Sequence, residues 1–580
     1  MPTQTFLPQE FRGLHNTIKS HSLFSLEFLF RKYVFLLKIF FTRFFSLSDS
    51  LIWDDLFKVK QDAKFLRDYK VDSNCQRMAL LPLLGGKLYD VKLMSMLAIG
   101  LKLSGWQIKI LLYKRRNVLP RLYLEAFGFS NFIYWEDFSS SLDPEEAVIN
   151  FENYLDKDLD FAKIKEWKYQ DCWIGPNILG TLSRSSYSRM PDFNTMVVKE
   201  KLRSLLKDSA LSIHTARLIV RKLKPDFMYI VEANYANNGP ITDVAINEGV
   251  DFAHTVGCPR DDALMFRRLT FGNRRGHPSS ISHENLKEIS KVQLSAKEND
   301  ELNKIFVDRY SGKWIVQSFN QQEVQGFDLE QLKSELGFSK SQKVAAVFSH
   351  VLWDANLFYG EDLFDDYAHW FVETVKAAIQ NESVNWIIKL HPANVWKLKR
   401  DNMEQQKLSE LVLLEEFLGS NFTLPSHVKL LLPDTKISTQ SLFSYIDYGV
   451  TVRGTVSTEL PCFGIPVFTA GTGRAHGHGF TVDSATRDDY LKKMSSIHTY
   501  DRLTDDKVLL ARKHAHAIFV KRPWVMKSFR PDFGDYSSTQ NPLSQNFILS
   551  AQSINEINDN GDLQKWSNWA SDRHSIDFLN

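Results

Sequence analysis

Residue types that bind phosphate follow two apolar segments in the second half of the chain. The segment 386–390 reads as a buried strand that carries Lys389 near its carboxyl end and is followed by His391 and Pro392. The segment 448–452 is followed by small and hydroxyl-bearing residues, namely Gly454, Thr455, Ser457 and Thr458. Open parallel α/β sheets bind ligands at the carboxyl ends of their strands, and a helix start offers backbone N–H groups to an anion. Together the two segments predict a phosphate site.

The elements around these segments alternate between strand and helix patterns. A strand at 343–348 ends in Ser349 and His350, and another strand follows Gly464. Glu459 falls one turn inside the helix that begins after the strand at 448–452. Alternation of this kind is typical of a doubly wound parallel sheet, so we expect one in the second half of the chain.

The first half shows a similar alternation. Its expected strands are 78–84, 106–113, 131–135, 226–231 and 252–256, and the charged region 143–224 has a helical pattern. A polar stretch without strand signals, 317–343, separates the halves. The sequence therefore predicts an α/β protein with two doubly wound, Rossmann-like domains that face a cleft.

These signals divide the chain into three parts. Residues 1–75 form an N-terminal extension with an amphipathic helix, 76–335 the first Rossmann-like domain with a helical insertion, and 336–580 the second, with C-terminal helices and a tail. Beyond the helix that ends near residue 520 the sequence reads as polar and irregular.

Composition excludes several function classes. The chain has 71 basic and 69 acidic side chains and a net charge of +2, so no overall field points to nucleic acid. Its four cysteines are widely spaced and show no zinc-binding or CxxC pattern, which favours a reducing compartment over a disulfide framework. Any anion site must therefore be local.

The segment 23–47 is rich in Phe and Leu but carries basic residues, namely Arg31, Lys32, Lys38 and Arg43. These charges interrupt it before an apolar run of about 18 residues builds up, which argues against a membrane-spanning helix. On a helical wheel the basic residues gather on one side and phenylalanines on the other. Such a helix lies on an anionic membrane surface, or alternatively packs on the protein itself or in a dimer.

The order of these motifs resembles the bacterial capsule polysaccharide biosynthesis family of GT-B glycosyltransferases, which includes capsular Kdo transferases. The resemblance is carried by Lys389, His391 and Pro392, by 454–459, and by 464–467. Gly85 and Gly86, after the first strand, match it more weakly.

The resemblance implies a metal-independent GT-B enzyme without a cofactor. Its donor would be a nucleotide-sugar, with CMP-Kdo or another CMP-linked acidic sugar favoured, and its acceptor a surface polysaccharide or lipid-linked glycan. Lys389, His391, Thr455 and Ser457 would hold the donor phosphate, and Glu459 would bind the donor ribose. The donor-binding residues would also include Ser349, His350, Pro392, Gly454 and Thr458. The implied location is the inner face of the bacterial cytoplasmic membrane, with peripheral attachment.

Sugar transfer also needs a carboxylate near the reacting carbon, as base or nucleophile. Glu232 follows a strand of the first half, and Asp354 lies in the loop after the first strand of the second half. Both are candidate catalytic residues. The alternatives are a loop salt bridge for Glu232 and a helix cap for Asp354.

Further candidates lie in loops. A glycine-rich loop after the last strand contains Arg474, His476 and His478, and it suggests a lid over the phosphate or the acceptor. Gly85 and Gly86 are candidates for the same acceptor or lid role. No DxD pattern follows a strand, so no metal site is expected. The segment 267–275 holds four arginines, Arg267, Arg268, Arg274 and Arg275, which suggest either an anion-binding cluster or an ordinary solvated surface.

Other functions fit the same sequence. A UDP-hexose transferase, a polyol-phosphate transferase of the teichoic-acid type and a nucleotide-sugar 2-epimerase keep the two-domain plan and change the chemistry. A non-catalytic glycan-binding scaffold is the remaining alternative.

Overall fold

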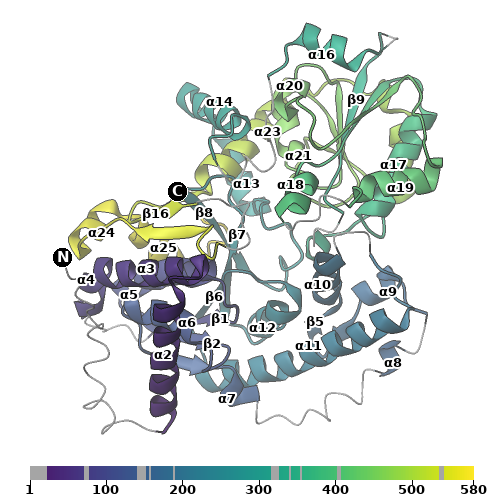
Figure 1. Ribbon diagram of the computed structural model, residues 1–580. Helices are drawn as coiled ribbons and strands as arrows, with labels where there is room; N and C mark the ends of the chain where they lie inside the picture. Colours follow the sequence, from purple (N-terminus) through teal and green to yellow (C-terminus); the bar gives the residue numbers. More distant parts are fainter. Residues whose placement is uncertain are drawn as a thin grey trace. The chain divides into compact units, whose positions relative to one another are not determined.

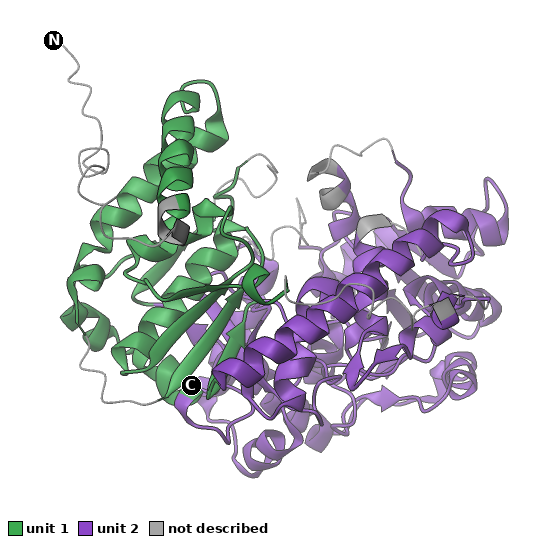
Figure 2. Cartoon of the chain, turned by 90° about the horizontal axis from the view of Figure 1, so that it is seen from below, with its two compact units in different colours: residues 1–141, 225–231, 527–570 green, residues 142–224, 232–526, 571–580 purple. Residues whose placement is uncertain are grey.

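The computed structural model describes residues 23–70, 77–139, 152–155, 158–186, 190–314, 326–338, 341–352, 356–400, 406–533 and 541–580. Contacts divide the chain into two compact units (Figure 2). Unit 1 comprises residues 1–141, 225–231 and 527–570, and unit 2 the remainder. The boundary expected near residue 335 falls inside unit 2, and the three-part division made from the sequence stays a prediction.

Unit 1 contains a parallel sheet in the order β6-β1-β2-β3. The strands are β1 (Met78–Leu83), β2 (Gln107–Leu112), β3 (Phe132–Tyr134) and β6 (Phe227–Ile230), connected in part by helices α5 (Leu88–Leu103) and α6 (Val118–Ala126). All six residues of β1 are buried, as expected for a central strand covered on both faces. The expected α/β alternation of the first half is confirmed here.

The C-terminal segment of unit 1 forms strands and helices, contrary to the expectation of an irregular tail. It forms the antiparallel pair β16 (Phe529–Asp532) and β17 (Asn546–Leu549), then α24 (Ile554–Asn560) and α25 (Asp562–Ser571). Trp566 is fully buried and donates a hydrogen bond to the Leu97 carbonyl of α5. A Cβ at Gly100 would lie 2.9 Å from Trp566 Cδ1, so the close approach requires glycine there.

The N-terminal helix is shorter than expected. It runs over α2 (Leu23–Thr42), and Ser46 caps the next helix, α3 (Leu47–Asp62). One face of α2, with Phe28, Leu36 and Ile39, is buried. This face therefore packs on the protein itself, which was one of the alternatives for this helix in the sequence analysis. Within the described residues no helix is both long enough and apolar enough to cross a membrane.

A second apolar face of α2 is exposed. Phe30, Val34, Leu37 and Phe41 recur at helical spacing on it, and Phe44 and Phe45 follow; Phe45 is 92% exposed. The exposed Arg31 and Lys38 lie at the same spacing beside this stripe.

Unit 2 contains a six-stranded parallel sheet in the order β11-β10-β9-β12-β13-β14. Figure 1 labels its strand β9. Its strands are β9 (Val344–Phe348), β10 (Asn385–Lys389), β11 (Val428–Leu431), β12 (Tyr448–Thr451), β13 (Val467–Thr469) and β14 (Val482–Asp483). In chain order this reads 3-2-1-4-5-6, the arrangement of the Rossmann fold. The doubly wound sheet expected in the second half is confirmed.

Successive strand residues face opposite sides of this sheet and enter separate cores. Trp386 and Ile388 pack with α17 (Tyr367–Gln380) and α19 (Ser409–Leu418). Ile387 packs on the other face, with residues of α16 (Leu329–Leu336), α20 (Thr439–Leu442) and α21 (Val456–Glu459). Lys389 is two residues beyond Ile387 and therefore shares this second face at the carboxyl end of β10.

The remaining elements of unit 2 include strands and helices from the first half of the sequence. They are β4 (Lys168–Tyr169), β5 (Cys172–Trp173), α10 (Gly175–Ser186), α11 (Met196–Leu223), α12 (Tyr235–Asn247), β7 (Asp251–Val256), β8 (Ala263–Leu269), α13 (His283–Lys291), α14 (Ala296–Tyr310), α23 (Asp505–His516) and β15 (Trp524–Val525). The pairs β7–β8 and β8–β15 are antiparallel.

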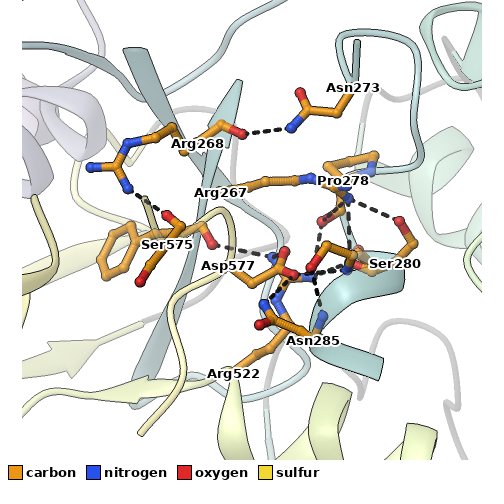
Figure 3. Close-up of polar contacts among 12 residues, drawn as sticks. Arg267, Arg268, Asn273, Pro278, Ser280, Asn285, Arg522, Ser575 and Asp577 are labelled. Carbon is orange, nitrogen blue, oxygen red and sulfur yellow. Dashed lines mark hydrogen bonds and ion pairs between the residues drawn. The ribbon is translucent and has the colours of Figure 1, made fainter. Parts of the chain in front are cut away.

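Two of the four arginines in 267–275 form neither a solvated surface nor an anion site. Arg267 and Arg268 are buried beside the C-terminal segment of unit 2, with which Arg267 forms an isolated antiparallel bridge to Asp577 (Figure 3). Arg268 donates to the Ser575 carbonyl, and Arg267 to the His277 carbonyl at 2.6 Å. The sequence shows the charges but not their partners, one of which lies 307 residues away.

Asp577 is the buried anion of this network. It accepts hydrogen bonds from the Ser282 N–H at 2.8 Å and from Asn285 Nδ2 at 3.1 Å. Arg522 Nη2 lies 3.6 Å from its Oδ1, and both side chains are fully buried. Burial opposes ionisation, but the Arg522 and Arg267 charges hold the pKa of Asp577 below its ordinary value.

We predict that Asp577→Asn destabilises the fold by about 3–5 kcal/mol, because it leaves buried guanidinium groups uncompensated. Urea unfolding of the full chain measures the effect. The control is Asp559→Asn, which removes the same charge from an exposed position on α24. A loss below about 1 kcal/mol, as for a surface pair, would contradict the assignment of Asp577 as the buried counter-ion.

Candidate functional site

A cavity of about 230 Å³ opens at the carboxyl ends of β9, β10 and β12. This is where the strand order of the sheet reverses, the position at which doubly wound sheets bind ligands. Of the residues predicted to bind the donor, all except Ser457 and Thr458 line this cavity: Ser349, His350, Lys389, His391, Pro392, Gly454, Thr455 and Glu459. The polar strand ends found in the sequence therefore lie together.

His350 holds two strand ends in place. Its Nε2 accepts a hydrogen bond from the Val452 N–H at 3.2 Å and lies 3.0 Å from Thr451 Oγ1. Its ring stacks on Tyr367 at 4.3 Å. Burial, followed by the charge of neighbouring groups, lowers the pKa of His350 well below its ordinary value. The ring is therefore neutral, and because Nε2 is the acceptor, the proton is on Nδ1.

Lys389 is a buried cation without a counter-ion. Its side chain is 6% exposed, and within the described residues no carboxylate or other acceptor binds its ammonium group. Burial lowers the pKa of Lys389 to about 8. A buried charge of this kind is costly unless something neutralises it, so an anion entering the cavity would gain this interaction.

His391 supplies a neutral donor beside this lysine. Its Nδ1 accepts a hydrogen bond from the Ala393 N–H at 3.2 Å, which places the ring proton on Nε2. Burial, and secondarily the Lys389 charge, lowers the pKa of His391 to about 4.

The segment after β12 approaches the cavity closely. A Cβ at Gly454 would lie 2.8 Å from Thr451 Oγ1, so only glycine fits there without displacement. The Ser457 hydroxyl donates to the Gly454 carbonyl at 2.7 Å and thus stabilises the turn. Helix α21 is only one turn long and continues as a 3-10 turn (Leu460–Phe463), so its terminal dipole is weaker than that of a longer helix.

Glu459 is fully buried and bound on both carboxylate oxygens. Arg309 Nε donates to Oε1 at 2.9 Å, and the Tyr310 hydroxyl donates to Oε2 at 2.7 Å. A donor ribose would have to share these bonds, and the ribose role stays a prediction.

Two further arginines line the cavity. Arg453 is paired with Asp362, whereas Arg474 donates only to the Arg453 carbonyl, at 3.3 Å, among the contacts of the described residues. Burial, and then the nearby Arg309, lowers the pKa of Arg474 to about 10, so it remains charged at neutral pH. Arg309, Thr455 and Arg474 also line an adjoining cavity of about 140 Å³.

The wall of the main cavity is therefore strongly cationic. Four charged bases, Arg309, Lys389, Arg453 and Arg474, face it with one carboxylate, Glu459. After the pairs with Glu459 and Asp362 are counted, Lys389 and Arg474 remain. A site with two unpaired cations and neutral imidazole donors is suited to bind a dianion or two single anionic groups.

Sequence reasoning missed part of this wall. His277, Arg309 and Tyr310 come from segments far away in the chain, and no local motif marks them. Arg453 was missed as well, although its position directly before the Gly454 motif could have indicated it. Arg474, predicted as a lid residue, is part of the wall itself, whereas His476 and His478 do not line the cavity.

The other predicted site residues lie elsewhere. Asp354 falls outside the described residues. Gly85 and Gly86 are exposed in unit 1, where a Cβ at Gly86 would meet open space. His476 lies 3.5 Å from Asp483, and the His478 ring lies 5.0 Å from those of His283 and His514.

Glu232 is connected to the cavity through a short series of contacts within unit 2. It accepts a hydrogen bond from the Asn234 N–H at 3.1 Å, and Asn234 Nδ2 donates to the Tyr359 hydroxyl at 3.1 Å. The Tyr359 ring lies 5.4 Å from that of His277, which lines the cavity. Burial raises the pKa of Glu232 above its ordinary value, although Arg184 and Arg274 oppose the shift.

Among the described residues no group of three or more His, Cys, Asp or Glu side chains is arranged to hold a metal ion.

Several solved structures are similar to this chain. The KpsC β-Kdo 2,7-transferase of Thermosulfurimonas dismutans is 12% identical and has a TM-score of 0.31; the match covers 61% of this chain and 89% of that one. UDP-GlcNAc 2-epimerase from Neisseria meningitidis is 11% identical (76% and 96% covered, TM-score 0.25). The spinosyn rhamnosyltransferase SpnG is 12% identical (76% and 95% covered, TM-score 0.25).

No family model and no curated protein matches the sequence. The similar solved structures thus include a β-Kdo transferase, an epimerase and a rhamnosyltransferase.

We predict that the affinity for CMP falls about tenfold between pH 7 and pH 9, because the anion binds the charged form of Lys389, which is lost as the pH rises through about 8. Isothermal titration calorimetry at several pH values measures it. Lys389→Met should bind more weakly and without this pH dependence, whereas Lys492→Met, at an exposed position, should behave as the unmodified chain. The same pH dependence in Lys389→Met would refute the role of this lysine.

Proposed function

We propose that the chain is a glycosyltransferase that transfers a sugar from a nucleotide-sugar donor to a glycan acceptor. The observation that carries the proposal is the pair of buried cations, Lys389 and Arg474, which have no carboxylate partner within the described residues and face one cavity at the switch point of a Rossmann-like sheet. Structural ion pairs leave no such charge uncompensated, whereas a binding site for phosphate requires it.

The two unpaired cations match two negative charges on the donor. A CMP-linked acidic sugar carries one charge on its phosphate and one on its sugar carboxylate, and a nucleoside-diphosphate sugar carries two on its phosphates. The adjoining cavity behind Arg309, Thr455 and Arg474 gives room for a group attached to the phosphate. We favour the CMP-linked acidic sugar, as the motifs suggest.

In the proposed reaction an acceptor hydroxyl attacks the anomeric carbon of the donor. The new C–O bond forms as the bond from that carbon to the phosphate oxygen breaks, and the nucleotide leaves with the electron pair. Lys389, Arg474 and the Nε2–H of His391 stabilise the charge on the departing phosphate. Glu232 takes the proton of the acceptor hydroxyl, a role suited to a carboxylate whose pKa burial has raised.

We further propose that α2 attaches the enzyme to an anionic membrane surface, where a lipid-linked or surface glycan acceptor is found. Its exposed stripe of Phe30, Val34, Leu37 and Phe41 would enter the acyl boundary. Arg31 and Lys38 beside the stripe would meet anionic headgroups. The face of α2 that packs on unit 1 fixes the helix in this orientation.

We predict that Glu232→Gln lowers kcat at least about 100-fold with CMP affinity unchanged, because the amide keeps the shape but accepts no proton. The assay follows release of the nucleotide from the donor in the presence of acceptor. Glu284→Gln, at an exposed position on α13, is the control and should retain full turnover. Full turnover by Glu232→Gln would exclude Glu232 as the base. An epimerised donor as the reaction product would show that the enzyme is an epimerase and not a transferase.

We predict that the double substitution Phe41→Ser and Phe45→Ser weakens binding to vesicles with one-third phosphatidylserine at least about tenfold, since each buried phenylalanine contributes roughly 1.5–3 kcal/mol. Vesicle flotation measures the bound fraction. Met196→Ser with Val197→Ser, which removes two residues of comparable exposure from α11, is the control and should bind normally. Equal binding by both variants would contradict attachment through α2.

A further inference from the structure

A second cavity, of about 220 Å³, lies within unit 2 beside β5 and α12. None of its lining residues belongs to the wall of the phosphate cavity. Two aromatic residues line it, Trp173 of β5 and Phe271 of the loop after β8. Phe271 is 83% exposed and lines the rim of the cavity, where none of the described residues buries its ring. We call this space the Trp173 cavity.

The two arginines of the segment 267–275 that do not bind the C-terminal segment line this cavity. The Arg275 guanidinium lies 3.4 Å from the centre of the Trp173 ring and pairs with Glu361 at 3.0 Å. Its Nε and Nη2 have no hydrogen-bond partner among the described residues. Arg274 donates to Asp243 at 2.7 Å, which fixes its side chain.

The polar wall of the Trp173 cavity is balanced in charge. Glu166, Asp171 and Asp243 are opposed by Lys168, Arg274 and Arg275. This differs from the phosphate cavity, where cations dominate. Carboxylates accept hydrogen bonds from hydroxyl groups and repel phosphate, and aromatic faces attract the positively polarised C–H groups of a saturated ring. A sugar ring has both hydroxyl groups and such C–H groups. The cavity is smaller than the roughly 300–1,000 Å³ of typical ligand pockets, so its volume suits a single sugar ring.

The Trp173 cavity is linked to the candidate base through direct contacts. Arg274 donates to Asn234 Oδ1 at 2.8 Å, and the Asn234 N–H donates to Glu232. Arg275 binds Glu361, the neighbour of Asp362, which pairs with Arg453 in the wall of the phosphate cavity. A ligand in the Trp173 cavity is thus bound by residues that contact the Glu232 segment.

We propose that the Trp173 cavity binds one sugar ring of the acceptor glycan. This rests on the proposed transferase function, because it assigns the acceptor. In this proposal Phe271 covers one side of the sugar ring, and the stacked pair Arg275 and Trp173 lies against the sugar. The carboxylates of Asp171 and Glu166 accept hydrogen bonds from the sugar hydroxyl groups.

The experiment is ligand-observed saturation-transfer NMR on the full chain. The probes are the methyl glycosides of glucose, galactose, N-acetylglucosamine, N-acetylgalactosamine, rhamnose and Kdo, titrated to about 20 mM. The variants are Phe271→Ser and Arg275→Gln, and the control is Met196→Ser, whose side chain is 81% exposed on α11. Because Phe271 is exposed, its substitution leaves the fold intact, and calorimetry with CMP reports on the phosphate cavity in every variant.

We expect at least one glycoside to bind saturably, and each of the two variants to weaken it at least about fivefold with unchanged CMP affinity. Binding that both variants leave unaltered would overturn the inference, as would the absence of saturable binding by all six probes. If glycosides bind as expected but CMP does not bind the unmodified chain, the Trp173 cavity remains a sugar site and the proposed transferase function fails.

Discussion

The candidate site depends on the reversal of strand order between β9 and β12. Connections leave these two neighbouring strands toward opposite faces of the sheet, so their carboxyl ends diverge and leave space between them. His350 bridges this space at its base, because its Nε2 accepts the Val452 N–H while its ring stacks on Tyr367. The imidazole must be neutral to accept that bond, and burial keeps it neutral. The site's geometry is therefore built on an uncharged histidine, and its positive charge comes from other residues.

Two kinds of buried charge can be distinguished among the described residues around the sites of unit 2. Arg309 with Glu459, Arg453 with Asp362 and Arg522 with Asp577 are compensated and stabilise or orient the fold. Lys389 and Arg474 have no such partner among the described residues, and their pKa values are lowered by burial. The free energy lost by desolvating these two cations is recovered only when an anion binds, which distinguishes a binding site from structural ion pairs.

Local sequence predicted what local physics determines. The sequence indicated the apolar strands at 344–348 and 385–389 and the polar residues that follow them. A strand buried on both faces requires a run of apolar residues, whereas polar residues are tolerated at its carboxyl end. Arg309 and Tyr310 were missed because their place opposite Glu459 depends on how α14 packs, which no spacing encodes. The ordered segment beyond residue 520 was missed for the same reason. Its strands are too short to show an alternating apolar pattern, and Trp566 donates its hydrogen bond to Leu97, which is 469 residues away in the sequence.

In the proposed function, the phosphate cavity recognises a nucleotide through its phosphate. The most direct test compares the melting temperature of the purified chain with cytidine, CMP, CDP, UDP and GDP at equal concentration, since a ligand that binds only the folded state raises it by mass action. We predict stabilisation by CMP and none by cytidine, with the CMP effect abolished in Arg474→Met. Equal stabilisation by cytidine and CMP, or no stabilisation by any phosphate-bearing ligand, would contradict it.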